Sequence, residues 1–155
     1  MYFVTPQRPA VAYAGAPRNQ RILRSMKTVE PCPCGGKSYA DCCGRYHGGI
    51  PAPSPEALMR SRYSAFALGF GDYLLTSWHP DTRPTELDVH TPPQPKWIGL
   101  QVLEARMQDA THGTVHFVAR CRIGGKAHRQ EENSRFVCED GRWYYLDGVE
   151  AESGN

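Results

Sequence analysis

Apolar residues change their spacing along the chain, and this change predicts a set of helices followed by a set of strands. Between residues 54 and 77 they recur at steps of three and four, which is typical of helices that bury one face. From Lys96 onward they recur at every second position, which is typical of strands. Residues 81–95 contain four prolines and are expected to form a loop. Helices followed by strands predict an α+β fold.

The first helix is predicted to begin at Ser54, which can cap it, with a proline and an acidic residue in the first turn. The residues Leu58, Met59, Arg62, Tyr63, Phe66 and Phe70 recur at helical spacing and give an apolar stripe with two arginines beside it. Glycines at 69 and 71 are expected to end this helix. Asp72 is expected to cap a second, short helix that runs to Ser77 and ends at Trp78-His79-Pro80.

Four strands are predicted, at residues 96–107, 113–123, 127–138 and 142–148. Gly124-Gly125 and Asp140-Gly141 have the composition of two-residue hairpin turns. The strands should therefore form an antiparallel meander. Helices laid across such a curved sheet would produce a cone with one open end.

Four of the six cysteines fall within twelve residues, in the spacing C-x-C-x7-C-C. Crowded thiolates need a neutralising cation, and Zn²⁺ takes four sulfur ligands at ~2.3 Å in a structural site. Gly35 and Gly36 would let the backbone turn tightly around the ion. The pattern predicts a structural Zn²⁺ site whose ligands are Cys32, Cys34, Cys42 and Cys43.

Other readings of the cluster stay open at this point. An iron–sulfur cluster also takes four cysteines. His47, four residues after Cys43, could replace one thiol, although an exposed histidine that hydrogen-bonds near the site is the simpler interpretation. A disulfide between Cys42 and Cys43 is disfavoured because adjacent cysteines bond only with strain.

The segment Cys-Pro-Cys-Gly-Gly-Lys-Ser-Tyr-Ala-Asp-Cys-Cys-Gly resembles the SEC-C motif, a small zinc module, with a loop of seven residues where eight are usual. Further motifs resemble the YchJ-like family of bacterial proteins of undefined activity: Leu-Met-Arg-Ser-Arg-Tyr-Ser-Ala-Phe from residue 58, Ser77-Trp-His-Pro80, Trp97-Ile-Gly-Leu100, Ser134-Arg-Phe136 and Trp143-Tyr-Tyr-Leu-Asp-Gly148. The resemblance implies a zinc module at residues 29–49 and a nuclear-transport-factor-2-like domain at residues 54–150. We expect the module to unfold on its own when Cys42→Ser removes the metal, while the larger domain keeps its thermal transition.

Charge is unevenly distributed. The net charge of the chain is +2, but residues 1–29 carry five cations and no acid, so the remainder is acidic. Residues 1–28, poor in large apolar side chains, are expected to be disordered or an over-extended gene start, with Met26 as the true start. Starting at Met26 would remove four arginines, and we therefore consider nucleic-acid binding unlikely to be the function. No apolar stretch reaches the ~20 residues that span a membrane, and no signal peptide is apparent. The reduced cysteines and these absences favour the cytoplasm.

The cone is the expected place for a ligand. Polar strand residues considered for it are His116, Arg120, Arg129, Glu131, Arg135 and Asp147. His116 and Glu131 are considered as a catalytic pair. The predicted register does not place them directly opposite one another, so we assign no catalytic residue. Arg60, Arg62 and Arg135 are expected to form ion pairs or to bond backbone carbonyls at the rim.

Two functions compete. The first is a zinc-binding adaptor that presents its module to a protein partner through Lys37, Tyr39, Arg45 and Tyr46, while the larger domain binds a ligand or a second partner. The second is a small-molecule enzyme of the isomerase or dehydratase type with its site in the cone. A small ligand in the cone and a homodimer through the sheet are further expectations, and no membrane partner is expected.

Overall fold

The computed structural model of the chain describes residues 30–150. Its elements are the helices α2 (Cys43–His47), α3 (Pro55–Leu68) and α4 (Gly71–Thr76) and the strands β1 (Lys96–Met107), β2 (His112–Ile123), β3 (Lys126–Glu139) and β4 (Arg142–Glu150). The strands form one antiparallel sheet in the order β1-β2-β3-β4. The predicted α+β architecture with an antiparallel meander is confirmed. The expectations for residues 1–28 lie outside the described residues.

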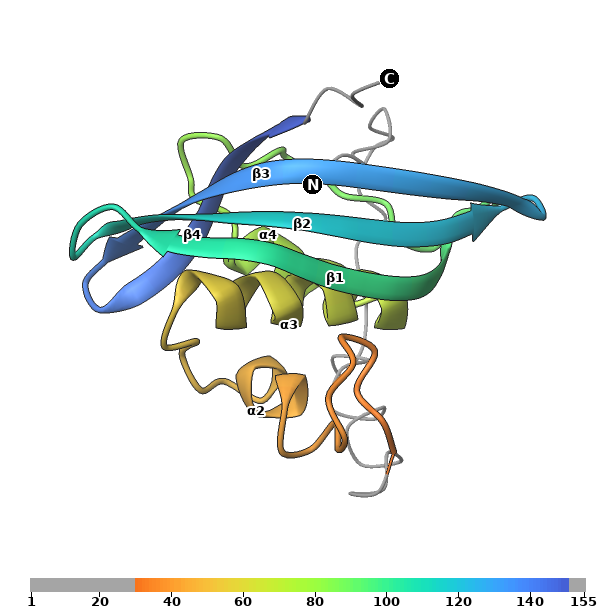
Figure 1. Ribbon diagram of the computed structural model, residues 1–155, viewed down its shortest axis with the longest axis horizontal. Helices are drawn as coiled ribbons and strands as arrows, with labels where there is room; N and C mark the ends of the chain where they lie inside the picture. The colour runs from red at the N-terminus through yellow and green to blue at the C-terminus, as the bar shows by residue number, and fades with distance from the viewer. Residues whose placement is uncertain (1–29, 151–155) are drawn as a thin grey trace.

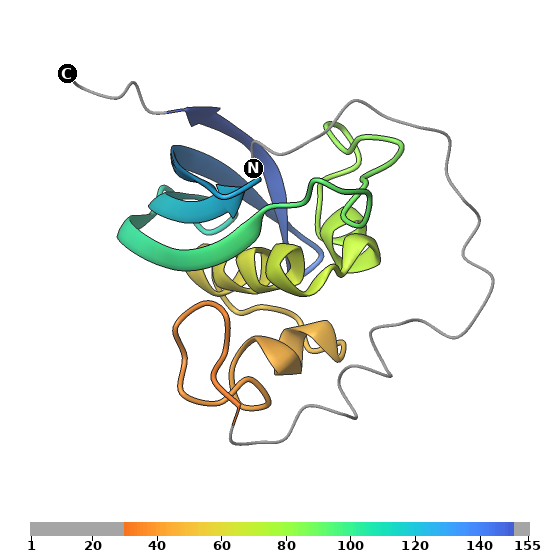
Figure 2. The same ribbon diagram turned by 90° about the vertical axis from the view of Figure 1, so that its right-hand side faces the viewer.

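The elements stack in three layers (Figure 1). The twisted sheet forms one outer layer, α3 lies against its concave face, and α4 lies beside α3 (Figure 2). Residues 30–47, which we call the cysteine segment and which include α2, lie on the opposite side of α3 from the sheet. Helix α3 therefore forms a wall that the sheet and the cysteine segment share.

The helix signals act largely as predicted. Ser54 Oγ accepts a hydrogen bond from the Ala57 N–H at 3.1 Å, and Gly69 ends α3 with φ +78°, a conformation that glycine adopts without strain. The prediction that Asp72 caps the second helix is wrong. Helix α4 begins at Gly71, so Asp72 lies within its first turn, where the helix dipole still favours an acid.

Both predicted hairpin turns are present. Gly124 and Gly125 have φ of 57° and 81°, and Asp140 and Gly141 have φ of 52° and 76°. Two successive positive φ values are the geometry that matches the twist of antiparallel strands across a two-residue turn. These turns fix the register, so that Ile123 pairs with Lys126 and Glu139 pairs with Arg142.

One apolar cluster runs through all three layers. Inward-facing sheet residues such as Phe117, Phe136 and Tyr145 pack with Met59 and Tyr63 of α3. The same cluster includes buried residues of the cysteine segment, namely Cys32, Cys34, Tyr39 and Cys43. The two parts of the chain consequently share a core across α3.

A positive charge is buried in this core. Arg62 is 1% exposed, and its Nη1 donates to Leu74 O at 2.7 Å and Ser77 Oγ at 2.6 Å. Its guanidinium lies 4.6 Å from the ring centre of Tyr145 and 5.1 Å from that of Trp78. Burial lowers the pKa of Arg62 to about 10. The expectation that Arg62 lies at the rim is therefore wrong, because its bonds to the end of α4 hold it inside.

The other two arginines do form ion pairs. Arg60 pairs with Glu56 one turn earlier in α3 at 3.0 Å. Arg135 pairs with Asp147 across β3 and β4, with 2.6 Å between Nε and Oδ1.

Candidate metal centre

The structure brings the four predicted cysteines together. The Sγ atoms of Cys32, Cys34, Cys42 and Cys43 all lie within 4.8 Å of one another, and three of these residues are buried. Cys34 and Cys42 Sγ are 3.5 Å apart, and Cys42 and Cys43 Sγ are 4.0 Å apart. A tetrahedral ion with bonds of ~2.3 Å has sulfur–sulfur edges of about 3.8 Å. The four thiols could therefore hold one metal ion.

Two glycines shape the loop that carries the first cysteine pair. Gly35 has φ +105°, and its N–H donates to Cys32 O at 3.0 Å. A Cβ on Gly36 would lie 2.8 Å from Cys42 Sγ. The second pair is placed by the start of α2, which begins at Cys43. The expected tight turn around the sulfur cluster is confirmed.

Polar groups of α3 bond the cysteine segment. Cys32 Sγ lies 3.4 Å from Ser64 Oγ, and Arg60 Nη1 donates to Cys34 O at 3.3 Å. Groups that orient metal ligands tune a metal site almost as strongly as the ligands themselves. Ser64 could not be predicted from the sequence, because a serine in a helix is usually solvent-exposed, yet here it is fully buried.

The thiols titrate as a group. Hydrogen bonds with the Cys34 and Cys43 thiols lower the pKa of Cys32, and hydrogen bonds with Cys32 and Cys34 raise the pKa of Cys43. Burial raises the pKa of Cys42 to about 11. The cluster thus stabilises one thiolate through its neighbouring thiols, and a divalent cation would displace the remaining protons.

His47 is neither a metal ligand nor an exposed histidine. Its Nε2 donates to Ser61 O at 2.8 Å, so the neutral ring accepts at Nδ1 from the Tyr39 hydroxyl at 2.6 Å. Burial is the main cause that lowers its pKa. Both ring nitrogens of His47 have hydrogen-bond partners, and its bond to Ser61 O connects α2 to α3.

Tyr39 is 1% exposed, so the expectation that it contacts a partner is wrong. Lys37 and Arg45 are exposed, and Tyr46 is half-buried.

The polar residues expected inside the cone lie on the outer face of the sheet. Buried Val115, Phe117 and Ala119 face α3, so the residues between them face outward. His116 Nε2 donates to Glu131 Oε1 at 2.7 Å. The pair considered from the sequence is therefore formed, but it lies on the outer face of the sheet. The residues concerned are His116, Arg120, Arg129, Glu131, Arg135 and Asp147.

The inner face carries polar residues that the sequence reasoning missed. Glu132 is 3% exposed and accepts from Ser134 Oγ at 2.7 Å, Tyr145 OH at 3.1 Å and Gln130 Nε2 at 3.2 Å. A Cβ on Gly148 would lie 1.9 Å from Glu132 Oε1, so this glycine makes room for the carboxylate. The period-two pattern of β3 could have revealed these residues once its inward positions were known.

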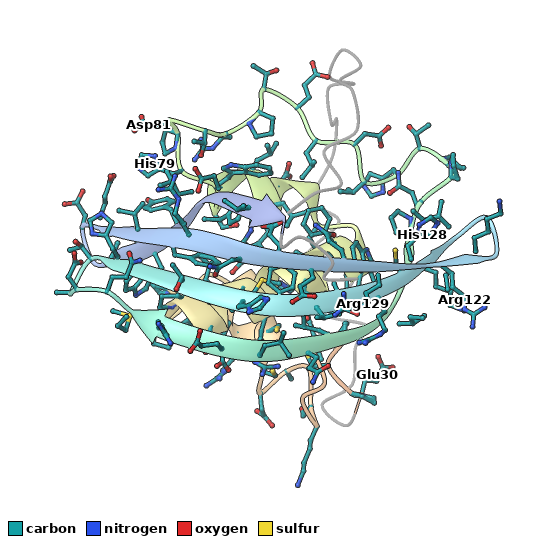
Figure 3. The ribbon with its side chains drawn as sticks, turned by 45° about the horizontal axis from the view of Figure 1, so that its top comes forward. Glu30, His79, Asp81, Arg122, His128 and Arg129 are labelled. Atoms are coloured by element: carbon teal, nitrogen blue, oxygen red, sulfur yellow. The ribbon has the colours of Figure 1, made fainter. Side chains whose placement is uncertain are left out.

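His79 connects the loop after α4 to the sheet. Its Nδ1 accepts from the Asp81 N–H at 3.1 Å, so Nε2 donates to Glu139 Oε1 at 2.7 Å. Figure 3 shows His79 and Asp81 together at one end of the sheet. The neighbouring carbonyl of Trp78 accepts a hydrogen bond from Arg83 at 2.8 Å.

A groove of about 230 Å³ lies where the cysteine segment meets the larger domain. Its walls come from α2, the linker, α4 and the start of β4. They include Tyr46, Ile50, Asp72, Tyr73, Arg142 and Trp143. Ile50 is 57% exposed at this groove, which is unusual for a large apolar side chain.

A cone-shaped α+β domain joined to a four-cysteine motif defines a SEC-C motif protein with a nuclear-transport-factor-2-like domain. A family model described as the YchJ middle NTF2-like domain matches residues 54–148. The chain belongs to this YchJ family.

Relatives agree with this assignment. The chain is 57% identical to a UPF0225 protein of Chromobacterium violaceum over 135 residues, covering 83% of this chain and all of the relative. It is similar in fold to a SEC-C motif containing protein from Rhodopseudomonas palustris, with a TM-score of 0.70, 38% identity, and coverage of 79% of this chain and all of that one. A SEC-C motif containing protein from Psychrobacter arcticus gives a TM-score of 0.67 at 28% identity, covering 83% and 86% of the two chains.

Within the described residues, no helix is both long and apolar enough to cross a membrane.

Proposed function

We propose that the protein is an adaptor whose cysteine cluster holds one structural Zn²⁺ ion and whose cysteine segment contacts a protein partner. The observation that carries the proposal is the mutual approach of four Sγ atoms within 4.8 Å. Four thiolates saturate a tetrahedral ion, so no position is left for water or a substrate. Such a site supports structure and does not catalyse.

Zinc is the metal we favour. A two-iron cluster distributes its four cysteines over two separate irons, whereas these sulfurs surround one point. Thiolate ligands in a closed tetrahedron suit Zn²⁺ better than the oxygen-preferring cations. Ligand thiols must stay reduced, and we therefore place the protein in the cytoplasm.

The partner surface we infer combines the exposed cations of the segment with the groove beside it. Lys37 and Arg45 are exposed, and Ile50 offers an apolar contact at the groove. An interface needs such an apolar centre with polar groups around it.

The enzyme alternative lacks a matching arrangement. It requires a histidine and a carboxylate in contact inside the cone, for proton transfer. Histidine–carboxylate contacts occur at His79, His112 and His116, and His116 faces outward from the sheet. Glu132 is held by Ser134, Gln130 and Tyr145.

The test is affinity capture from a bacterial lysate with the full chain, with zinc measured in each preparation. We expect wild-type protein to contain one zinc per chain and to capture a defined partner. Cys42→Ser should lose both zinc and partner, and Lys37→Glu should keep zinc but capture several-fold less. Arg106→Glu, which changes an exposed cation of β1 by the same charge, is the matched control and should behave as wild type. Recovery of the same partner with zinc-free Cys42→Ser would refute the adaptor role.

A further inference from the structure

Three strands bring cations together on the outer face of the sheet, near the β2–β3 turn. We call Lys96, Arg120, Arg122 and Arg129 the basic patch. Lys96 begins β1, the two middle arginines end β2, and Arg129 follows the turn in β3. All four side chains are exposed. Figure 3 shows Arg122 and Arg129 at this end of the sheet, away from His79 and Asp81.

The strand register sets these cations against one another. Lys96 lies directly opposite Arg122, and Arg120 lies directly opposite Arg129. Like charges at directly opposed positions of neighbouring strands destabilise a sheet. Two such pairs side by side concentrate positive charge on this face, and a bound anion would reduce their repulsion.

The described part of the chain supplies little compensation. Arg129 Nη2 lies 2.8 Å from Glu131 Oε2, and the same carboxylate also accepts from His116. No ion pair joins Lys96, Arg120 or Arg122 to a described acidic residue. The patch therefore keeps most of its positive charge available to a partner.

The geometry favours phosphates over a protein surface. Neighbouring strands lie ~4.8 Å apart and alternate residues ~6.7 Å apart, so the cations spread over about 10 Å by 7 Å. Guanidinium groups match phosphate oxygens with paired hydrogen bonds. The patch consists of four cations, with Ile98 at the β1 bulge as an exposed apolar neighbour. Protein interfaces are instead centred on clusters of aromatic and apolar anchors.

We propose that the basic patch binds the phosphate backbone of a nucleic acid without reading its sequence. Base-independent contact follows because the patch offers cations and no ring on which a base could stack. This site is distinct from the cations near the N-terminus and from the cysteine segment, so it does not rest on the adaptor proposal.

The test uses the full chain with zinc and a fluorescein-labelled single-stranded RNA of 20 nucleotides, followed by anisotropy between 50 and 200 mM salt. Four phosphate contacts on a single strand correspond to about a 50-fold loss of affinity over this range. Arg120→Glu/Arg122→Glu should weaken binding at least tenfold at 50 mM salt. Its log–log salt slope should be shallower than that of wild type by about 1.4, which corresponds to two lost contacts.

The matched control is Arg83→Glu/Arg106→Glu, which makes the same change in charge at exposed positions outside both the basic patch and the proposed partner surface. We expect it to weaken binding less than threefold. An equal loss in both variants would overturn the proposal, because net charge or another segment would then explain binding. Absence of RNA binding by wild type at 50 mM salt would also overturn it.

The melting temperature shows whether the patch variant loses RNA binding because it misfolds. Arg120→Glu places an acid opposite Arg129, and Arg122→Glu places one opposite Lys96, so both repulsions become attractions. The double variant should therefore melt at a higher temperature than wild type while it loses RNA. A lower melting temperature would contradict the repulsion from which the patch is inferred.

Discussion

The cysteine segment and the sheet domain both bury polar groups, but they stabilise them in different ways. In the segment, the buried groups are four thiols and the Tyr39–His47 pair, which lie close together in the chain. In the sheet domain, Arg62 and Glu132 are brought together from elements far apart in the sequence. The first arrangement could hold a metal ion, whereas the second is made from the chain itself.

Helix α3 joins the two arrangements. Its sheet side carries aromatic and long side chains such as Tyr63, which packs against Trp97 with ring centres 5.5 Å apart. Its other side carries Ser61 and Ser64, which contact the cysteine segment. The contacts across α3 replace our expectation of independent unfolding: loss of the metal should also weaken the larger domain.

The largest effect on the sheet domain should come from Arg62→Ala. The change removes the bonds to Leu74 O and Ser77, leaves a cavity, and removes a buried cation that interacts electrostatically with the buried Glu132. We expect a loss of about 4 kcal/mol in the free energy of unfolding, measured with urea. Zinc content should stay at one per chain.

A double variant sharpens this prediction. Arg62→Met/Glu132→Gln keeps the volume and removes both charges, so it should recover part of the stability that Arg62→Met loses alone. If the two substitutions act additively, Arg62 and Glu132 do not interact, and the sheet domain does not stabilise its buried charges by pairing them.

A smaller effect is expected in the cysteine segment from Tyr39→Phe. It leaves His47 Nδ1 buried without a donor, which should cost about 1–2 kcal/mol in zinc-saturated protein. Tyr46→Phe is the matched control, because that half-buried hydroxyl accepts only a 3.3 Å bond from Arg45. Equal losses in the two variants would show that the buried hydrogen bond does not hold α2 to α3.

The smallest effect should come from the surface pair of Arg135 with Asp147. A hydrogen bond from Arg135 lowers the pKa of Asp147 below its ordinary value of 3.8. An acid with a lowered pKa stabilises the fold above that ordinary value and stops doing so as the pH falls through the lowered one. Asp147→Asn should therefore cost about 0.5 kcal/mol at pH 7 and nothing at strongly acidic pH, measured by urea unfolding. A cost that does not vary with pH would exclude the ion pair as its cause.

Local signals in the sequence were sufficient for the elements and for the sulfur cluster. Hairpin turns at Gly124-Gly125 and Asp140-Gly141 have strong composition rules, and the cysteine spacing brings its own ligands together. Both depend on residues that are close in the chain.

It was harder to predict which face of the sheet each strand residue lies on. Period two separates β3 into two sets of residues, but only packing decides which set faces α3. Glu131 was therefore expected inside the cone, where Glu132 lies instead. Ser61 and Ser64 were missed for a related reason. Small polar residues of a helix are buried only when another part of the chain covers them, and the helical pattern of apolar residues does not show that the cysteine segment packs there.

The most direct test of the central claim is calorimetric unfolding of the full chain before and after its metal is removed with a chelator under reducing conditions. Our account predicts one zinc per chain. It also predicts that the melting temperature of the sheet domain falls by several degrees when zinc is removed, because the cysteine segment then no longer packs on Ser61 and Ser64 of α3. Re-addition of zinc should restore the original transition. A sheet-domain transition that is unchanged by complete removal of zinc would contradict the claim that the metal holds the cysteine segment in the shared core.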